Sequence, residues 1–349
     1  MISIGDMDHE ILNPLNYAGW DELVESHPDS TLFHSSHWAR VLYDTYRYKP
    51  VYVGSVRAGQ LQWMIPMMEV RSFLTGVRGV SLPFSDYCEP LLSARFDVEE
   101  AIKELVDLGR SARWKYFELR CSDNLLQERP CYGRYYRHIL TLNYDVEKVY
   151  SGFHSTVRRN IRKSHKEGVK AVRYNTESSV RTYYRLHCLT RKRQGLPPQS
   201  YRFFRNIFEH IIAKGLGFVM LAEYEGKPIA GGVFFSYQDK AMFKYGASDY
   251  AYQHCRANDL VMWKAIEWFC QNNFRQICFG RTQMDHEGLR RFKLGWGGEE
   301  GLFKYYKYSM AEDKFIENHG FERPGYSVFK KMPIFMLRIF GSILYRHVG

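Results

Sequence analysis

The chain has few cysteines, and their positions exclude the usual cysteine-based sites. Its 349 residues include seven cysteines, an odd number with no CxxC pair and no zinc-ligand spacing. Disulfide scaffolds and structural zinc are therefore not expected. The sequence predicts free thiols in a reducing compartment, with no metal.

Long apolar runs are also absent. No stretch reaches the roughly 20 apolar residues of a membrane-spanning helix, and residues 1–10 carry acidic side chains where an export signal is basic. We expect a cytoplasmic protein. After Pro333, apolar residues combine with Arg338 and Arg346. This pattern is typical of a terminal helix packed on the protein, or of a helix at the anionic inner face of the cytoplasmic membrane.

No low-complexity segment or Pro-rich linker divides the chain, whose composition of 45% hydrophobic and 25% charged residues is globular. A length of 349 residues fits two domains better than one. The formal net charge of +11 indicates an anionic partner. Three classes remain open: nucleic acid such as tRNA, a nucleotide-sugar or lipid-linked precursor, and an acidic membrane surface. The P-loop, the Rossmann fingerprint, G-x-S-x-G and H-E-x-x-H are missing.

Two halves of the chain repeat one order of elements, in which a hairpin and a strand are followed by an amphipathic helix and another strand. The hairpins are expected at 51–67 and 218–235, the helices at 98–112 and 259–272, and the last strands at 116–119 and 276–279. A helix at 36–42 precedes the first repeat, and helices at 157–167 and 178–193 precede the second. The sequence thus predicts an α+β fold with related domains over 1–147 and 148–312 and a helical segment over 313–349.

Six local motifs occur in a fixed order along these elements. They are Phe33-His34-Ser35-Ser36-His37-Trp38, Pro83-Phe84-Ser85-Asp86-Tyr87, Val157-Arg158-Arg159-Asn160-Ile161-Arg162-Lys163, Thr190-Arg191-Lys192-Arg193-Gln194-Gly195-Leu196-Pro197, Tyr245-Gly246-Ala247-Ser248 and Phe292-Lys293-Leu294-Gly295-Trp296-Gly297. Together they resemble the FemAB-type branch of the GNAT acyltransferase superfamily, in which two GNAT-like domains share one chain. Lys331-Met332-Pro333 resembles the subset encoded with exopolysaccharide and PEP-CTERM protein-sorting systems.

This resemblance implies transfer of an acyl or aminoacyl group to an amine of a cell-envelope precursor, either a peptidoglycan peptide or an amino sugar. No tightly bound cofactor is expected, and the donor would be aminoacyl-tRNA or acyl-CoA. An acyl-CoA-dependent N-acyltransferase of polysaccharide biosynthesis is the alternative within the enzyme class. A non-catalytic module that binds RNA or a membrane surface is the alternative outside it.

The loop expected to hold a coenzyme A pyrophosphate bears on the donor. GNAT enzymes use a Q/R-x-x-G-x-G/A loop at a helix N-terminus, whereas residues 254–260 read His-Cys-Arg-Ala-Asn-Asp-Leu. Without the glycines, backbone amides do not easily wrap a pyrophosphate. The sequence therefore favours aminoacyl-tRNA over acyl-CoA.

Lys293 is the first candidate for catalysis. It follows Phe292 and precedes three glycines that allow backbone to approach a ligand, namely Gly295, Gly297 and Gly298. A cation here suits the oxyanion of acyl transfer. The resemblance implies this role for Lys293 and places Phe292 and Trp296 in the binding site. An exposed lysine favoured by the helix dipole is the alternative.

Asp86 is the second catalytic candidate, because a carboxylate in this Pro-flanked loop suits an amine proton or the orientation of the acceptor. It also suits a simple turn cap. Tyr87 beside it and Arg40 of the 36–42 helix are assigned to substrate binding. The resemblance also places Tyr245 at the acceptor, with a core tyrosine as the alternative.

A basic tract opens the second half of the chain. Arg158, Arg159 and Arg162 belong to a helix that presents cations around much of its girth. With Arg193 of a second basic run, they are predicted to bind the phosphates of donor or acceptor. A solvated basic face is the alternative.

Overall fold

The computed structural model describes residues 10–93, 97–122, 125–126, 129–318 and 327–348. Residues 1–9, which carry most of the segment tested above as an export signal, lie outside them. Of the described residues, unit 1 takes those within Met1–Tyr135, Leu302–Phe321 and Arg346–Gly349, and unit 2 those within Tyr136–Gly301 and Glu322–Tyr345. Strand β15 (Glu299–Ser309) returns the chain from unit 2 to unit 1. The units therefore cut the chain differently from the predicted domain limits, which stay a prediction.

Unit 2 contains a sheet in the order β10-β11-β12-β13-β14. Its strands are β10 (Lys170–Tyr174), β11 (Gly217–Tyr224), β12 (Lys227–Tyr237), β13 (Lys240–Ser248) and β14 (Gln276–Gln283). The first four pair antiparallel. Glu225 and Gly226, with φ of 50° and 74°, make the tight turn between β11 and β12. The hairpin predicted at 218–235 is confirmed.

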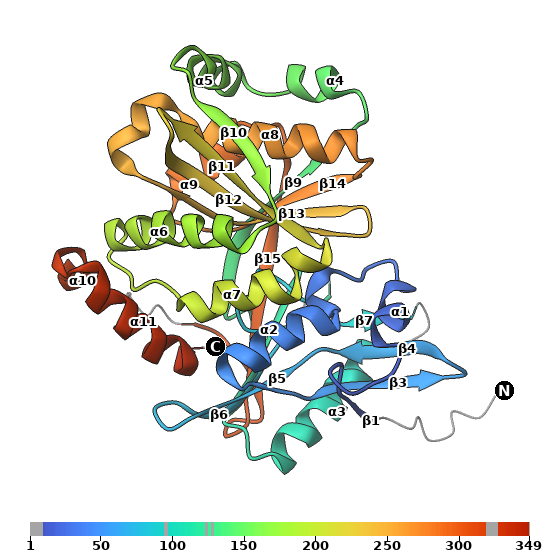
Figure 1. Cartoon of the computed structure of the whole chain (residues 1–349). Coiled ribbons are helices and arrows are strands. Elements are labelled where there is room, and N and C mark those ends of the chain that lie inside the picture. Colours follow the sequence, from blue (N-terminus) through green and yellow to red (C-terminus); the bar gives the residue numbers. More distant parts are fainter. Residues whose placement is uncertain (1–9, 94–96, 123–124, 127–128, 319–326, 349) are drawn as a thin grey trace. The chain divides into compact units, whose positions relative to one another are not determined.

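Helices cover both faces of this sheet (Figure 1). They are α4 (Val146–Ser151), α5 (Ser155–Lys166), α6 (Glu177–Arg193), α7 (Tyr201–His210) and α8 (Ala257–Gln271). Alternate residues of β11 explain the two layers. Phe218 and Met220 join the core that contains α8, whereas Leu221 on the other face lies with Tyr183 of α6 beside Gly231. Helix α5 packs on α8, so α5 and α6 belong to opposite faces.

The strands β13 and β14 are parallel and are joined by α8, but they pair over only part of their length. The paired residues are Lys240 with Gln276, Ala241 with Ile277 and Met242 with Cys278. The remaining halves, up to Ser248 and Gln283, are not paired with each other. Ligand sites in α/β sheets tend to form at carboxyl ends of strands where the connections diverge. The strand end that leads to Lys293 lies at such a point.

Unit 1 has two sheets, one in the order β1-β3-β4-β7 and one in the order β15-β8-β6-β5-β2. Their strands are β1 (Glu10–Leu12), β2 (Lys49–Pro50), β3 (Tyr52–Arg57), β4 (Gln60–Ile65), β5 (Met68–Ser72), β6 (Gly76–Val80), β7 (Leu91–Leu92), β8 (Tyr116–Ser122) and β16 (Lys314–Ile316), which pairs with β15. The helices are α1 (Trp20–Glu25), α2 (Ser36–Tyr46) and α3 (Val98–Ser111).

The repeat predicted from the sequence appears as strand, helix and parallel strand in each unit. In unit 1, β6 and β8 pair in parallel around α3, as β13 and β14 do around α8 in unit 2. The predicted α+β fold with a tandem order of elements is confirmed. The first hairpin departs from the pattern, because β3 and β4 lie in a different sheet from β8.

The other described elements include strand β9 (Gly133–Thr141), helix α9 (Glu287–Leu294), the C-terminal helices α10 (Ser327–Lys331) and α11 (Ile334–Val348), and three short 3-10 turns at Leu32–His34, Ile212–Lys214 and Tyr250–Cys255. The seven cysteines are free thiols. In the described part of the chain, no helix has the length and apolar character to span a bilayer. Within the same ranges, no three His, Cys, Asp or Glu side chains gather as metal ligands.

Candidate functional site

Lys293 is buried between the end of β14 and helix α9. Its side chain lies in the last turn of α9 and is 2% exposed. The Nζ ammonium donates to the carbonyl of Gly280 at 2.8 Å and to that of Arg281 at 3.1 Å. Gly280 has a φ of 68°, a left-handed conformation within β14 that glycine adopts without strain. The alternative of an exposed lysine at a helix end is therefore wrong, and Lys293 is a buried cation.

A second set of charged groups lies beside Lys293 in unit 2. His138 of β9 is fully buried, and its Nε2 lies 3.0 Å from Oε2 of Glu300. The guanidinium of Arg290 donates to both oxygens of Glu300, at 2.8 Å each, and lies 4.1 Å from the ring centroid of Tyr136. Such a bidentate pair fixes the orientation of the carboxylate. Glu300 in turn fixes the imidazole.

The protonation of His138 follows from its partners. A carboxylate accepts hydrogen bonds only, so Nε2 of a neutral His138 carries the proton and Nδ1 carries the lone pair. Burial lowers the pKa of His138, and the charge of Lys293 lowers it further, against the opposing effect of Glu300. Hydrogen bonds from Arg290 lower the pKa of Glu300. The pair is thus a neutral imidazole held by an ionised carboxylate.

Three buried polar atoms on these elements have no hydrogen-bond partner among the described residues. They are Nδ1 of His138, Oγ1 of Thr282 in β14 and Nε1 of Trp296. An unsatisfied buried polar group costs roughly 1–3 kcal/mol. Such groups are rare in folded proteins and concentrate at sites with a catalytic role. Their presence on β9, β14 and the turn after α9 favours this region as the site.

The glycines after Lys293 serve packing. A Cβ at Gly295 would meet the side chain of Val157, one at Gly297 the carbonyl of Gly152, and one at Gly298 the carbonyl of Ile139, at 2.8, 3.0 and 3.1 Å respectively. The sequence predicted that these glycines let backbone approach a ligand. Their neighbours show instead that they let the turn fit against α4, α5 and β9.

Phe292 and Trp296 line this same turn. Their rings meet edge to face at 5.9 Å, and Trp296 also contacts Phe153 at 5.0 Å. Trp296 is fully buried and Phe292 half-buried. The structure therefore brings Lys293, Phe292 and Trp296 together. The described contacts of the two rings are packing contacts, and their predicted contact with substrate stays a prediction.

The basic helix α5 begins against the Lys293 turn. The backbone N–H of His154, its N-cap, donates to the carbonyl of Gly295 at 2.9 Å. Along α5, Arg158 is half-buried, whereas Arg159 and Arg162 are exposed. The Nε of Arg158 is buried with no partner in the described ranges. These three arginines therefore lie one to two turns from the Lys293 segment, and their predicted contact with phosphates stays a prediction.

Arg193 lies on a different helix from these three arginines. It ends α6, on the opposite face of the sheet, and is exposed with its guanidinium 5.1 Å from the ring centroid of Tyr250. Arg191 of the same run is structural, because it donates to the carbonyl of Pro197 at 3.3 Å and to the hydroxyl of Tyr345 at 2.5 Å. The two basic runs are thus carried by helices on different faces.

The start of α8 carries a buried carboxylate. Asp259 lies in the first turn of the helix, is 8% exposed and accepts from Nδ2 of Asn160 at 3.3 Å. Burial raises its pKa to about 6. Arg256 before it has a φ of 56° and makes no side-chain cap. An acidic group where amides would face a pyrophosphate disfavours an anion at this helix end.

Replacing Asp259 by Asn is expected to stabilise the protein near neutral pH. Because the folded-state pKa of about 6 lies above the ordinary value of 3.8, ionisation costs stability as the pH rises from about 4 to about 6. Asn removes that cost. The free energy of unfolding should rise by roughly 1–3 kcal/mol near pH 7 and stay almost unchanged near pH 4. Denaturant titrations at both pH values test this, with Asp285→Asn, an exposed carboxylate, as control. Equal effects at both pH values contradict it.

Tyr245 lies on the half of β13 that β14 does not pair. Its ring meets Phe204 edge to face at 5.5 Å and His187 at 6.5 Å. His187 accepts or donates a bond to Gln199 at 2.9 Å, and burial lowers its pKa to about 3. Tyr245 is therefore half-buried in an aromatic cluster with α6 and α7. Its predicted contact with the acceptor stays a prediction.

Asp86, Tyr87 and Arg40 belong to unit 1. Asp86 is 8% exposed, and its carbonyl accepts from the hydroxyl of Tyr305 at 2.7 Å. Tyr87 stacks on Phe303 at 4.7 Å. Arg40 donates to the carbonyl of Leu15 at 3.4 Å. The Asp86 loop is thus an ordered part of unit 1, and its role with the acceptor stays a prediction.

Backbone strain marks the Asp86 loop. Phe84 has a φ of 61°, which is uncommon for a bulky residue. The guanidinium of Arg120 holds the loop by donating to the carbonyls of Leu82 at 2.9 Å and Ser85 at 3.2 Å. Strained residues that are held this firmly tend to lie at functional sites. The observation favours function for the loop over a simple turn cap.

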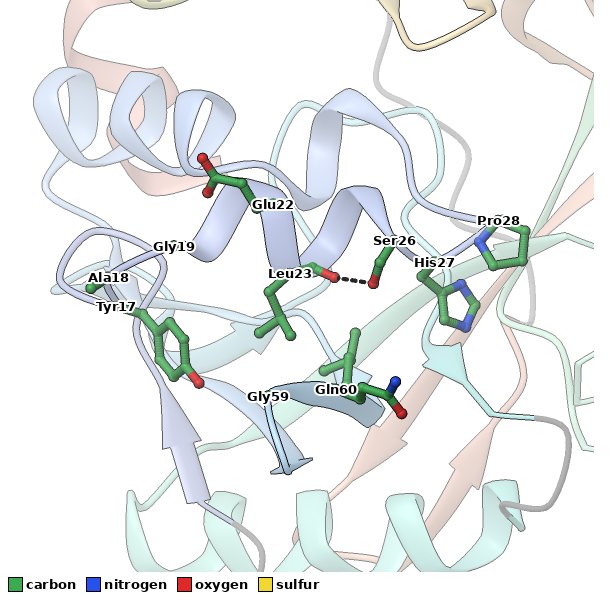
Figure 2. Close-up of a pocket in the computed structure, with 11 residues that line it drawn as sticks. Tyr17, Ala18, Gly19, Glu22, Leu23, Ser26, His27, Pro28, Gly59 and Gln60 are labelled. Carbon is green, nitrogen blue, oxygen red and sulfur yellow. Dashed lines mark hydrogen bonds between the residues drawn. The ribbon is translucent and has the colours of Figure 1, made fainter.

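A separate hollow in unit 1 carries none of the predicted residues. Figure 2 shows it beneath α1 and beside the turn between β3 and β4, with the Ser26 hydroxyl donating to the Leu23 carbonyl at 2.7 Å. Its volume is about 580 Å³. Its lining includes Glu22 and no Lys or Arg. This lining does not favour the binding of an anionic substrate.

His138, Glu300 and Arg290 were not predicted from the sequence. His138 and Glu300 are 162 residues apart and belong to no motif. The one available signal is the alternation of Tyr136, His138 and Leu140, which places them on one face of a strand. This alternation does not indicate that Glu300 is the hydrogen-bond partner of His138.

The second half of the chain matches a known family. Residues 151–308 match the model described as an acetyltransferase (GNAT) domain. This match includes Lys293, Arg290 and Glu300 but not His138. No curated protein matches the chain.

Solved structures share the fold over most of the chain. The crystal structure of FemX has a TM-score of 0.66 at 13% identity, covering 85% of this chain and 97% of FemX. The C-terminal domain (DUF2156) of a putative lysylphosphatidylglycerol synthetase from Agrobacterium fabrum has a TM-score of 0.56 at 11% identity, covering 82% and 89%. A tandem GNAT protein from the clavulanic acid biosynthesis pathway, solved without AcCoA, has a TM-score of 0.54 at 9% identity, covering 87% and 99%.

These comparisons define the class. The match over residues 151–308 indicates an acyltransferase domain, and the solved structures agree with it in their tandem fold. The likeness to FemX agrees with the FemAB-type resemblance drawn from the motifs. At these low sequence identities, the solved structures show the fold alone.

Proposed function

We propose that the chain transfers an aminoacyl group from aminoacyl-tRNA to an amine of a cell-envelope precursor, a peptidoglycan peptide or an amino sugar, in the cytoplasm. The observation that carries the proposal is the buried Lys293 beside the array of His138, Glu300 and Arg290. A neutral base next to a fixed cation is what aminolysis of an ester requires. The FemAB-type motifs support the substrate class and the exopolysaccharide-associated subset.

The proposed reaction is aminolysis of the aminoacyl ester, with Lys293 and His138 as the two catalytic groups. The acceptor nitrogen attacks the ester carbonyl, a C–N bond forms, and the carbonyl oxygen becomes an oxyanion. The charge of Lys293 stabilises that oxyanion in a low-dielectric site. Nδ1 of His138 takes the amine proton, directly or through one water, and gives it to the leaving ribose oxygen as the C–O bond breaks.

Phosphate contacts would come from the basic helix α5. Arg159 and Arg162 are exposed on it, and its N-cap is joined to the Lys293 turn. Guanidinium groups bind two phosphate oxygens at once. In the proposal they hold the anionic part of donor or precursor while the reacting groups meet at Lys293.

The rival donor is acyl-CoA, which the GNAT domain model and the tandem GNAT neighbour favour. The sequence of the α8 entry and the buried Asp259 favour tRNA.

Mass spectrometry of the acceptor separates the two donors. The purified protein is incubated with nucleotide-linked and lipid-linked precursors and with either charged tRNA or acetyl-CoA. We expect an amino-acid residue mass to be added with tRNA only. An acyl increment with acetyl-CoA would move the proposal to the rival. No product with either donor, together with salt-sensitive RNA binding, would replace both by the non-catalytic module.

A further inference from the structure

The C-terminal helix α11 is fixed to unit 2 by one face. Leu337 is fully buried, and Gly341 lies so close to the carbonyl of Pro198 that a Cβ would overlap it. The hydroxyl of Tyr345 donates to the carbonyl of Pro197 at 3.1 Å and accepts from Arg191 at 2.5 Å. Of the two interpretations drawn from the sequence, packing on the protein therefore describes this face.

The other face of α11 exposes large apolar side chains. Phe335, Ile339 and Ile343 are 64%, 56% and 56% exposed and recur every four residues, so they form one stripe along the helix. Phe340 beside the stripe is 39% exposed and lies 6.2 Å from Phe329 of α10. Single exposed apolar residues are common, but a continuous row on one helix marks an interaction surface.

The charges around this stripe favour one kind of partner. Residues 327–348 contain no Asp or Glu and four cations, namely Lys330, Lys331, Arg338 and Arg346. A second copy of the chain would bring like charges together, and the whole chain already carries a formal net charge of +11. An anionic lipid surface complements both the apolar stripe and its basic flanks.

We propose that α11 docks the protein on an anionic phospholipid bilayer, with Phe335, Ile339 and Ile343 inserted at the interface. The helix lies in the plane of the surface, with its apolar stripe among the outer acyl carbons and with Lys330, Lys331 and Arg346 at the headgroups. Arg338 instead lies over the ring of Tyr184, 5.5 Å from its centroid. This inference is independent of the proposed reaction. Its consequence for that reaction is a high local concentration of any lipid-linked acceptor.

Vesicle co-sedimentation of the full chain tests the surface. The probes are vesicles of phosphatidylcholine alone and vesicles of equal parts phosphatidylcholine and phosphatidylglycerol. We expect binding to the anionic vesicles only, weakened by salt. The double substitution Ile339→Asp and Ile343→Asp should lower the partition coefficient by at least roughly tenfold. Lys330→Gln with Lys331→Gln should reduce its dependence on salt.

The matched control is Tyr144→Asp, because Tyr144 is 82% exposed on a loop elsewhere in unit 2. It should bind as the unmodified protein does. Circular dichroism melts of each variant check folding, which the substitutions should leave intact because the side chains face solvent. Equal binding by the double variant and the control, or no binding by the unmodified chain, overturns the proposal. A dimer that the double variant splits, without vesicle binding, assigns the stripe to a second copy instead.

Discussion

Lys293→Met is expected to lower kcat/KM for transfer by roughly 100- to 1,000-fold, the loss typical of removing one group that stabilises an oxyanion. The substitution deletes a buried cation while keeping an unbranched side chain of similar length. The acceptor KM should change little, because the charge acts on the transition state. Steady-state kinetics of purified variants measures both parameters.

A structural role for Lys293 must be separated from a catalytic one. Methionine leaves the carbonyls of Gly280 and Arg281 without their ammonium partner, so some loss of stability is also expected. Kinetics are therefore measured well below the melting temperature of each variant. Lys293→Arg, which keeps the charge, should retain more activity than Lys293→Met, and Lys170→Met, an exposed lysine of β10, should keep it all. Equal activity of Lys293→Arg and Lys293→Met would contradict a catalytic role for the positive charge of Lys293.

His138→Gln is expected to lower kcat by roughly 100- to 10,000-fold, as loss of a general base does. In the unmodified protein, activity should rise with pH through the lowered pKa of His138 and level off at neutral pH. The acidic limb of the pH–rate profile should disappear in His138→Gln. An unchanged limb in that variant would assign the proton to another group.

Glu300→Gln tests the support of His138. Glutamine keeps the size but loses the negative charge that raises the pKa of His138, so the acidic limb should move to lower pH and kcat should fall. Glu299→Gln, an exposed neighbour, is the matched control. A shift of the limb to higher pH in Glu300→Gln would contradict the electrostatic account.

Elements that depend on local pattern could be predicted from the sequence. Helix α8 was expected at 259–272 and occupies Ala257–Gln271, because its apolar residues recur at helical spacing. The hairpin β11–β12 followed from alternation around Glu225 and Gly226. The tandem order of these elements was enough to predict the fold.

Features that depend on distant contacts could not be predicted. The bond between His138 and Glu300 joins strands separated by more than a hundred residues, and no local rule pairs them. The glycines near Lys293 show the opposite error. The close backbone approach that they allow was predicted, but the missing Cβ of Gly295 and Gly298 makes room for Val157 and Ile139 and not for a ligand. A glycine in the sequence indicates a close backbone contact, but it does not indicate which group makes that contact.

The most direct test of a shared site is the single-turnover rate of the double variant Lys293→Met and His138→Gln. If the cation and the base act on one transition state, the double variant should be little slower than the slower of the two single variants, because residues that act as a unit are not additive. Losses that add in full on a logarithmic scale would show that the two residues act separately. That result would contradict a catalytic site built around Lys293 and His138.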